Sequence, residues 1–340
     1  MTIRRYQQGD EAQIQSLFHK TFHTERGQNV WRWKFIENPK QERPFILVWD
    51  EDGQILGHIS LWVSDAYING EKKKVGLRVD TMVDPDARGK GIYKQLNKAL
   101  LEEAKADDIA YLYGFPAPKA KELFVRYTEA THLTDMPRYV FIQHPVALLA
   151  SKLAPLKLFK PLDGVFEKLK RPSFSSDKRL QVKKVTHCDE RFDELAKKTS
   201  TQEEAALIRD ADYLNWRYHD HPVNKYTMAA VYDHDELKGY VVTKLTEGKF
   251  KNGLIIDWLA VDEDSVWETL LEAAFHHLSE ADLIQSWQLS HTIGAEVLKK
   301  HNFTHKDSPM PLVGKEVVPD TAFMNDVKSW MITMGDVDSF

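Results

Sequence analysis

The residues best suited to chemistry in this sequence form one short loop that is rich in glycine and basic side chains. Residues 88–91 read Arg-Gly-Lys-Gly, and they lie between an apolar run that ends at Val83 and a helical run over 95–101. The first backbone N–H groups of a helix have no partner within the helix and carry a partial positive charge, so they bind anions. Glycine allows close approach of a phosphate, and Arg88 and Lys90 add positive charge. The loop therefore predicts a pyrophosphate site, although it matches neither the Walker loop nor the dinucleotide fingerprint.

An internal repeat determines the architecture that must position this loop. Residues 33–39 read WKFIENP and residues 216–222 read WRYHDHP. Farther along, residues 79–83 (VDTMV) match residues 256–261 (IDWLAV), with one extra residue in the second segment. Matches that occur in the same order along the chain indicate a duplicated domain.

Each copy has the pattern of strands followed by helices. Asp52-Gly53 and Asn69-Gly70 are typical hairpin turns between β-rich runs. We expect the following elements in the first copy: strands 3–6, 45–50, 55–63, 74–83 and 109–113, a helix after Gly9-Asp10 and a helix over 90–105. We expect the following elements in the second copy: a start near Leu180, strands 226–232, 239–245 and 254–261, helices 266–279 and 295–301, and a last strand over 330–338.

Residues 144–179 separate the two copies. Leucines alternate there with lysines, and prolines interrupt the pattern. A basic amphipathic helix can lie on a membrane surface, but a helical linker packed against its own domains is the preferred interpretation. The expected organisation is a first domain over 1–143, a linker over 144–179 and a second domain over 180–340.

The composition excludes several classes of protein. The 46 Lys and Arg residues face 51 Asp and Glu residues, a net charge of -5, which argues against a dedicated nucleic-acid binder. A single cysteine, Cys188, excludes an internal disulfide, and no ligand-spaced Cys/His set suggests a metal. No apolar run approaches the roughly 20 residues that span a bilayer, and the N-terminus resembles no secretion signal. We therefore expect a cytoplasmic protein with no metal and no stable membrane insertion.

Residues 88–93 resemble the coenzyme A-binding signature Q/R-x-x-G-x-G/A of the Gcn5-related N-acetyltransferase (GNAT) superfamily. Arg88 and Gly91 match its first two fixed positions, whereas Tyr93 replaces the final small residue. The Val-x-Pro sequence before the loop and its place after a β-meander are similar too. The resemblance implies an α/β fold of two tandem GNAT-type domains, each a mixed, mostly antiparallel twisted sheet flanked by helices.

The resemblance also implies how acetyl-CoA is bound. Backbone groups of Met82 and Val83 would pair with the pantetheine arm as another strand would. The backbone N–H groups that would hold the pyrophosphate belong to Arg88, Gly89, Lys90, Gly91, Ile92 and Tyr93. The second copy has Asp262, Glu263 and Asp264 at the corresponding helix start, where negative charge repels a pyrophosphate, so one cofactor per chain is expected.

Three side chains are candidates for proton transfer. Asp80 is the first candidate for the general base or the amine anchor, although Asp257 at the matching place of the other copy suggests a structural role instead. The helix tyrosine that many family members use as proton donor is replaced by Phe124. Tyr113 and Tyr127 are the substitutes, with packing in the core as the alternative for each.

The expected activity is acetyl-CoA-dependent N-acetylation of a small-molecule amine, such as an amino sugar, a polyamine or an amino acid. One alternative is a coenzyme A-binding sensor or scaffold without turnover. Another is an aminoacyl transferase that acts on cell-wall precursors, a class of tandem proteins of this fold that does not need the basic loop. The sequence gives no indication of the oligomeric state.

Overall fold

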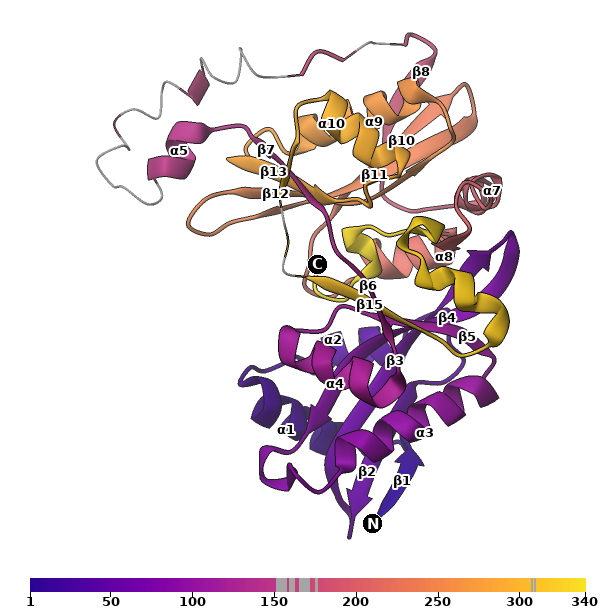
Figure 1. The fold of residues 1–340 in the computed structure, drawn as a ribbon. Coiled ribbons are helices and arrows are strands. Elements are labelled where there is room, and N and C mark those ends of the chain that lie inside the picture. The colour runs from indigo at the N-terminus through magenta and orange to yellow at the C-terminus, as the bar shows by residue number, and fades with distance from the viewer. Residues whose placement is uncertain (151–157, 159–162, 165–171, 175–176, 307, 309) are drawn as a thin grey trace.

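A computed structural model describes residues 1–340 except 151–157, 159–162, 165–171, 175–176, 307 and 309. The described chain forms two lobes, each built on one twisted sheet with helices against its faces (Figure 1). Both sheets are mixed and mostly antiparallel, as the sequence predicts. None of the helices in the described part of the chain is long and apolar enough to cross a membrane.

The first sheet carries the predicted loop. Its strands lie in the order β1 (Thr2–Arg5), β2 (Phe45–Glu51), β3 (Gln54–Ile68), β4 (Glu71–Val83), β5 (Ile109–Gly114), β15 (Pro311–Glu316) and β6 (Thr131–Asp135). Only β4 and β5 pair in parallel along this path. Both predicted hairpin turns are present, because Asp52-Gly53 and Asn69-Gly70 adopt the positive φ angles that such two-residue turns require.

Two helices cover each face of the first sheet. α1 (Glu11–Phe22) and α2 (Gln28–Phe35) pack against the face that includes Leu77 and Val79. α3 (Ile92–Ala106) packs against the opposite face through a stripe of apolar residues that includes Leu96 and Leu100, and α4 (Pro118–Thr128) lies beside α3. The sequence predicted α1 and α3, whereas α2 was not foreseen.

The second sheet has a similar plan. Its strands lie in the order β14 (Thr304–Lys306), β7 (Arg138–Ile142), β13 (Leu283–Trp287), β12 (Asn252–Ala260), β11 (Glu236–Thr246), β10 (Thr227–Asp233) and β8 (Leu180–Val185). α9 (Asp264–His277) and α10 (Ile293–Lys300) cover one face. α7 (Glu190–Lys198) and α8 (Ala211–Leu214) lie on the face that turns toward the first lobe.

The two sheets exchange strands. β7 leaves the first half of the chain and pairs with β13 in the second sheet, while β15 returns from the second half and pairs with β5 and β6. The short strand β9 (Ala205–Leu207) also joins the first sheet, beside the end of β3. The expected boundaries at residues 143 and 180 therefore do not separate the two sheets. A sequence repeat indicates that a domain was duplicated, but it does not indicate which sheet each strand joins.

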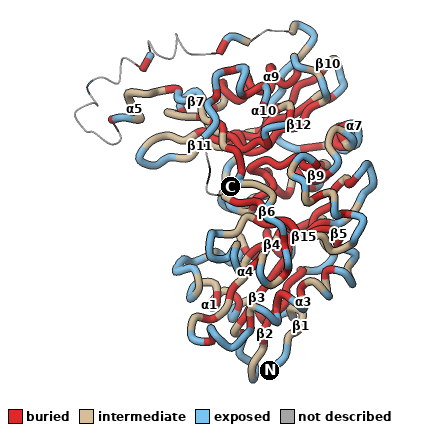
Figure 2. The backbone as a smooth tube through the Cα atoms, in the orientation of Figure 1, coloured by how far each residue is buried: buried red, intermediate tan, exposed pale blue. Residues whose placement is uncertain are grey.

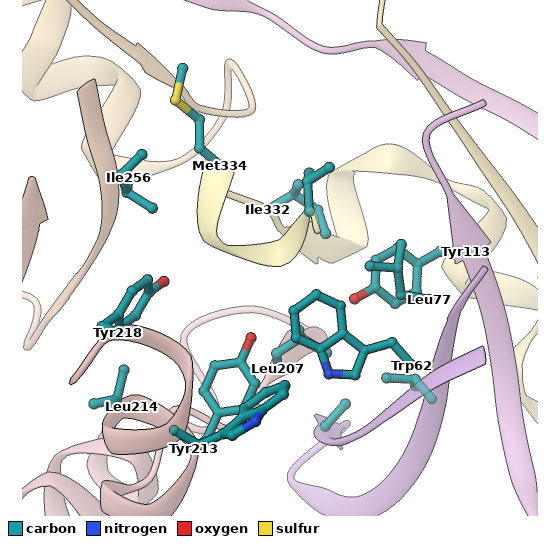
Figure 3. Close-up of a cluster of buried hydrophobic side chains, with 14 of the residues drawn as sticks. Trp62, Leu77, Tyr113, Leu207, Tyr213, Leu214, Tyr218, Ile256, Ile332 and Met334 are labelled. Atoms are coloured by element: carbon teal, nitrogen blue, oxygen red, sulfur yellow. The ribbon is translucent and has the colours of Figure 1, made fainter. Parts of the chain in front are cut away.

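A continuous apolar core joins the lobes. Buried residues extend without a break through both sheets and the junction between them (Figure 2). Trp33 and Trp216, which occupy equivalent places in the repeat, stack with ring centroids 5.1 Å apart. Each indole N–H donates to the other residue's backbone carbonyl, at 2.8 and 2.9 Å. Figure 3 shows Leu77 of the first lobe and Ile256 of the second on either side of Ile332.

The C-terminal segment differs from its prediction. Instead of one strand over 330–338, the structure has β16 (Trp330–Met331), which pairs with β9, followed by a 3₁₀ turn over Met334–Asp336. The side chain of Thr333 accepts from the N–H of Gly335, and the carboxylate of Asp336 accepts from the N–H of Thr333, so a capping box closes the turn.

The segment between the lobes begins with α5 (Pro145–Ala150). The carboxylate of Asp163 accepts from the N–H groups of Val146 and Ala147, both at 2.8 Å, and so caps the start of this helix. Most of the predicted helical linker over 144–179 lies outside the described residues.

Candidate active site

Strands β4 and β5 separate at the centre of the first sheet. Their parallel pairing ends at Leu77 and Tyr113, while β4 stays paired with β3 as far as Val83. Within the described chain, no strand pairs with the other edge of β4 from Arg78 to Val83. This free edge, which includes Met82, opens from an apex at Leu77 and Tyr113 toward the predicted phosphate loop.

The predicted loop has the geometry of an anion site. The side chain of Asp84 accepts from the N–H of Asp86 at 2.9 Å and starts a 3₁₀ turn over Pro85–Ala87. Gly89 and Gly91 then take φ values of 88° and 77°, a region that glycine enters at little cost. The chain enters α3 at Ile92, two residues after the predicted helix start.

The backbone of this loop is free to bind. The N–H groups of residues 89–93 have no acceptor among the described residues. A side chain placed at Gly89 would meet nothing within 4 Å, and one at Gly91 would meet only Gln95. The side chains of Arg88 and Lys90 are exposed. The residues present therefore fit a phosphate group.

Acidic residues beside the loop are neutralised. Lys20 on α1 places its Nζ atom 2.8 Å from the carboxylate of Asp84 and 2.6 Å from that of Asp86. Lys90 lies 3.6 Å from Glu51. The exposed side chain of Arg88, in contrast, has no carboxylate partner among the described residues.

A cluster of five side chains connects α3 and α4 beside the free edge. Arg78, the first residue beyond the apex, donates from Nη2 to the hydroxyl of Tyr93 at 2.9 Å and from Nε to Thr81 at 3.2 Å. Its guanidinium lies 4.2 Å from the ring centroid of Phe124 on α4. The ring of Tyr127 lies 5.7 Å from that of Tyr93. Sequence reasoning did not select Arg78, although a lone arginine within the apolar run of β4 was visible.

Tyr113 and Tyr127 lie on opposite faces of the sheet. Tyr127 is half-buried on the α3–α4 face beside Tyr93. Tyr113 is buried on the other face, 5.7 Å from the ring of Trp330, and burial raises its pKa well above the ordinary tyrosine value. Only Tyr127 is therefore next to the residues that surround the free edge on the loop side.

Asp80 lies at a β-bulge. The register between β3 and β4 shifts between His58 and Ser60, and Asp80 has a φ of 45°. The extra residue breaks the strand alternation and turns the carboxylate toward α1 and α2. Which face Asp80 takes could not be predicted, since alternation applies only to a regular strand.

Two cations hold the carboxylate of Asp80. Arg26 forms an ion pair with one oxygen and Lys34 lies 3.0 Å from the other, while Lys34 also lies 2.6 Å from Asp338. Burial alone would raise the pKa of Asp80, but Lys34 and Arg26 outweigh it and hold the pKa well below its ordinary value. The carboxylate stays charged at neutral pH with both oxygens engaged, which favours the structural interpretation. Its role as general base stays a prediction.

His58 is a titratable group at the bulge that sequence reasoning missed. The ring is buried, and Nδ1 lies 2.6 Å from the backbone oxygen of Asp80. Burial lowers the pKa of His58 to about 4, so the ring is neutral and its Nδ1–H donates to that oxygen. Nε2 is then an acceptor, and it has no partner in the described part of the chain.

The second lobe repeats the aspartate and its cations. Asp257 forms an ion pair with Arg209 at 3.0 Å, and Arg209 also contacts Asp336 at 2.8 Å. Arg209 and Arg217 occupy the repeat positions of Arg26 and Lys34, with the same spacing in sequence. Arg209 keeps the contact with the aspartate, whereas Arg217 donates to the backbone carbonyls of Gly335 and Val337. The register shift next to Asp257, between Val242 and Thr243 of the neighbouring strand, completes the likeness.

The second lobe does not repeat the phosphate loop. At the start of α9, the N–H groups of Val266 and Trp267 both bond the carbonyl of Glu263, at 2.9 and 3.3 Å. Trp258, in the repeat position of Thr81, is fully buried and packs 5.1 Å from the ring of Trp267. An aromatic pair therefore lies at the place that corresponds to the free edge of β4 in the first lobe.

No candidate metal centre accompanies these features. Among the residues that the structure describes, no group of three or more His, Cys, Asp or Glu side chains is placed to hold a metal ion.

Comparisons with known proteins agree with this geometry. Residues 2–122 match the family model of the acetyltransferase (GNAT) domain. A search of curated proteins found no significant match. A GCN5-related N-acetyltransferase from Anabaena variabilis has a TM-score of 0.69 at 13% identity, over 93% of this chain and 73% of that one.

Two further solved structures have similar folds over almost the whole chain. A conserved protein of unknown function from Enterococcus faecalis, a probable N-acyltransferase, has a TM-score of 0.67 at 12% identity, over 93% of this chain and 72% of that one. Eis1 from Mycobacterium abscessus has a TM-score of 0.62 at 14% identity, over 96% and 76%. At such identities these likenesses concern the fold.

The family match and the fold together define the class. Residues 2–122 form a GNAT acetyltransferase domain, which identifies the protein as an acyltransferase, and its two tandem lobes share the fold of solved GCN5-related N-acetyltransferases.

Proposed function

We propose that this protein is an acetyl-CoA-dependent N-acetyltransferase that binds its cofactor in the first lobe and acetylates the amine of a small molecule. The observation that carries the proposal is the free edge of β4 leading into a loop whose N–H groups are unpaired. The diphosphate would lie against residues 88–93, where backbone donors, Arg88 and the start of α3 attract negative charge. The backbone of Met82 and Val83 would hold the pantetheine arm along the free edge.

Bound acetyl-CoA would supply an activated acetyl thioester, and the chain would orient it. The amine would enter from the α1–α2 face, at the bulge that carries Asp80. Tyr127 is the proposed proton donor, because its hydroxyl belongs to the face that carries the loop, whereas Tyr113 is enclosed in the interlobe core. Asp80 and the lone pair of His58 remain the candidates that could receive the amine proton or orient its acceptor.

The second lobe would bind no cofactor. Its helix start carries three acidic residues, its N–H groups are engaged by Glu263, and the buried Trp258 lies where the first lobe has the free edge of β4. We propose that the second half of the chain instead supports the first lobe, since it supplies the strand β15 to the first sheet and packs its C-terminal segment against that lobe. The buried, free Cys188 is in keeping with the predicted cytoplasmic location.

Release of the coenzyme A thiol from acetyl-CoA, measured with a panel of amines, tests this function. We expect release that depends on one class of amine and a mass increase of one acetyl group in the product. Thiol release with no amine dependence, despite tight binding of coenzyme A, would contradict transfer and support a sensor.

A further inference from the structure

Arg78 is a half-buried cation that has no counter-ion among the described residues. Its Nη1 atom is inaccessible to solvent and has no hydrogen-bond partner in the described part of the chain, and no carboxylate there lies within ion-pair distance. The neighbours of its guanidinium are the hydroxyls of Tyr93 and Thr81 and the ring of Phe124. An unpaired buried charge costs several kcal/mol, and burial accordingly lowers the pKa of Arg78.

This uncompensated charge contrasts with the other buried arginines. Arg209 forms ion pairs with two carboxylates, and Arg26 forms an ion pair with one. Arg217 has no carboxylate partner either, but its N–H groups donate to the backbone carbonyls of Gly335 and Val337. The described chain therefore satisfies these three arginines, whereas Arg78, like Arg5 and Arg138 elsewhere in the fold, keeps one buried donor without an acceptor.

The place of Arg78 in the fold indicates which negative charge it meets. It is the first residue of β4 beyond the apex, and the phosphate loop lies at the other end of the free edge, roughly 16 Å away for five strand residues. Gly114 faces it across the apex, where a side chain would come within 3.4 Å of the Cβ of Arg78 and 3.7 Å of Phe124. If the pantetheine arm of coenzyme A starts at the loop and follows the free edge, its sulfur end therefore lies next to Arg78.

We infer that Arg78 binds the sulfur end of coenzyme A and stabilises the thiolate as it leaves. This inference rests on the proposed function and assigns a catalytic role to a residue that sequence reasoning passed over. In the transfer, a C–N bond forms to the amine and the C–S bond breaks. The electron pair of that bond leaves on sulfur beside the guanidinium, and the amine proton passes to a base or to water. With Phe124 in the place of the usual donor, the charge of Arg78 stabilises the sulfur while the C–S bond breaks, and Tyr127 then gives the thiolate its proton.

The sharpest test compares how the protein's affinity for two ligands depends on pH. Coenzyme A has an alkyl thiol whose pKa lies above neutral pH, as that of the cysteine thiol does at about 8.5, whereas desulfo-coenzyme A has no thiol. If Arg78 prefers the thiolate, calorimetry between pH 7 and 9.5 should show the affinity for coenzyme A rising about tenfold for each unit by which the bound thiol pKa falls. The affinity for desulfo-coenzyme A controls for Tyr93 and Tyr127, the titratable groups that face the site. The affinity for desulfo-coenzyme A should change with pH only as far as groups of the protein itself titrate.

Arg78→Met and Arg78→Lys complete the experiment. In Arg78→Met the extra rise for coenzyme A should disappear and kcat should fall on the order of 10²-fold, with KM for acetyl-CoA changed less than kcat. Arg78→Lys keeps the charge and should recover part of both. Arg4→Met is the control, since Arg4 pairs with Asp10 and Asp50 away from the free edge and should leave both readouts as in the wild type.

The possible outcomes separate this inference from the proposed function. Wild-type protein that binds coenzyme A and its desulfo analogue with the same pH dependence would overturn the inference alone. So would a folded Arg78→Met variant with unchanged kcat, or one that loses affinity equally for both ligands. Wild-type protein that binds neither ligand would overturn the proposed function as well.

Discussion

Replacing Asp257 by asparagine should destabilise the protein by about 3 kcal/mol. Asp257 is 1% exposed. Its carboxylate accepts hydrogen bonds, at 2.9 to 3.1 Å, from Arg209, Tyr218, Tyr240 and Thr333. Asparagine has nearly the same shape but only one carbonyl oxygen and no charge, so Arg209 loses one of two counter-charges inside the core. Removal of one partner of a buried pair costs about 3–5 kcal/mol, and we expect the low end because Asp336 stays 2.8 Å from Arg209.

Thermal unfolding measures this loss directly. A change of 1 kcal/mol shifts the Tm of a domain of 150–250 residues by about 2–4 °C, so we expect a fall of roughly 6–12 °C. Activity measured well below the Tm should change little, because Asp257 belongs to the lobe without the loop. A Tm within 2 °C of the wild type would refute the reasoning that the repeated aspartate holds the lobe together.

Asp80→Asn is the matched variant in the first lobe, and it adds a pH dependence. Since the pKa of Asp80 is held well below its ordinary value, the stability it contributes is fully present above about pH 4, where unfolded aspartate is ionised. That contribution is lost as the pH falls further. The Tm difference between wild type and Asp80→Asn should therefore be largest near pH 6 and shrink toward pH 3.

The same variant decides between the two roles of Asp80. A general base would lose a factor on the order of 10² to 10⁴ in rate on this substitution, with coenzyme A affinity preserved. Equal and mild effects on activity from Asp80→Asn and Asp257→Asn would assign both aspartates to the framework of the repeat.

Three more predictions concern other parts of the molecule. Burial and the neighbouring Glu204 raise the pKa of Glu203 to about 7, so its folded form binds a proton more tightly than the unfolded chain and stability falls as the pH rises toward 7. Glu203→Gln should therefore be more stable than the wild type at pH 8, by roughly 1 kcal/mol after allowance for its partly exposed side chain, and an equal Tm at pH 8 would contradict this. Trp33→Ala removes the stacked pair with Trp216 and both reciprocal hydrogen bonds; it should cost about 3–5 kcal/mol, measured by urea unfolding, and a loss under 1 kcal/mol would show that the lobes do not depend on it. Tyr127→Phe should lower kcat at least tenfold if its hydroxyl gives the proton, whereas Tyr113→Phe should not, and the reverse order would exchange their roles.

The features that could be predicted from the sequence are local ones. The phosphate loop follows from two glycines, two basic residues and a helix start within six positions, and both hairpin turns follow from two residues each. The duplicated aspartates Asp80 and Asp257 are visible because a repeat conserves spacing along the chain. In these cases the determining interactions lie within a few residues of one another.

The features that could not be predicted depend on distant partners. Asp80 could be identified but its state could not, because Lys34 is shared with Asp338 at the far end of the chain and because a bulge sets its direction. The exchange of β7 and β15 leaves no trace in the periodicity of either strand. Arg78 looked like an ordinary strand residue, and what singles it out is its place at the apex together with a buried N–H that has no acceptor among the described residues.

The central claim is that one coenzyme A binds each chain, at the loop of the first lobe, and a calorimetric titration tests it most directly. Gly91→Glu places a negative charge where the pyrophosphate should lie, and Gly91→Ala supplies the matched control, since both residues are strained at a φ of 77° and the Cβ atom that they share meets nothing closer than Gln95 at 4.0 Å. We predict one site in the wild type, and an affinity at least tenfold weaker in Gly91→Glu than in Gly91→Ala, a loss of about 1.4 kcal/mol or more. Two sites of similar affinity, or equal affinities in the two variants, would contradict the account.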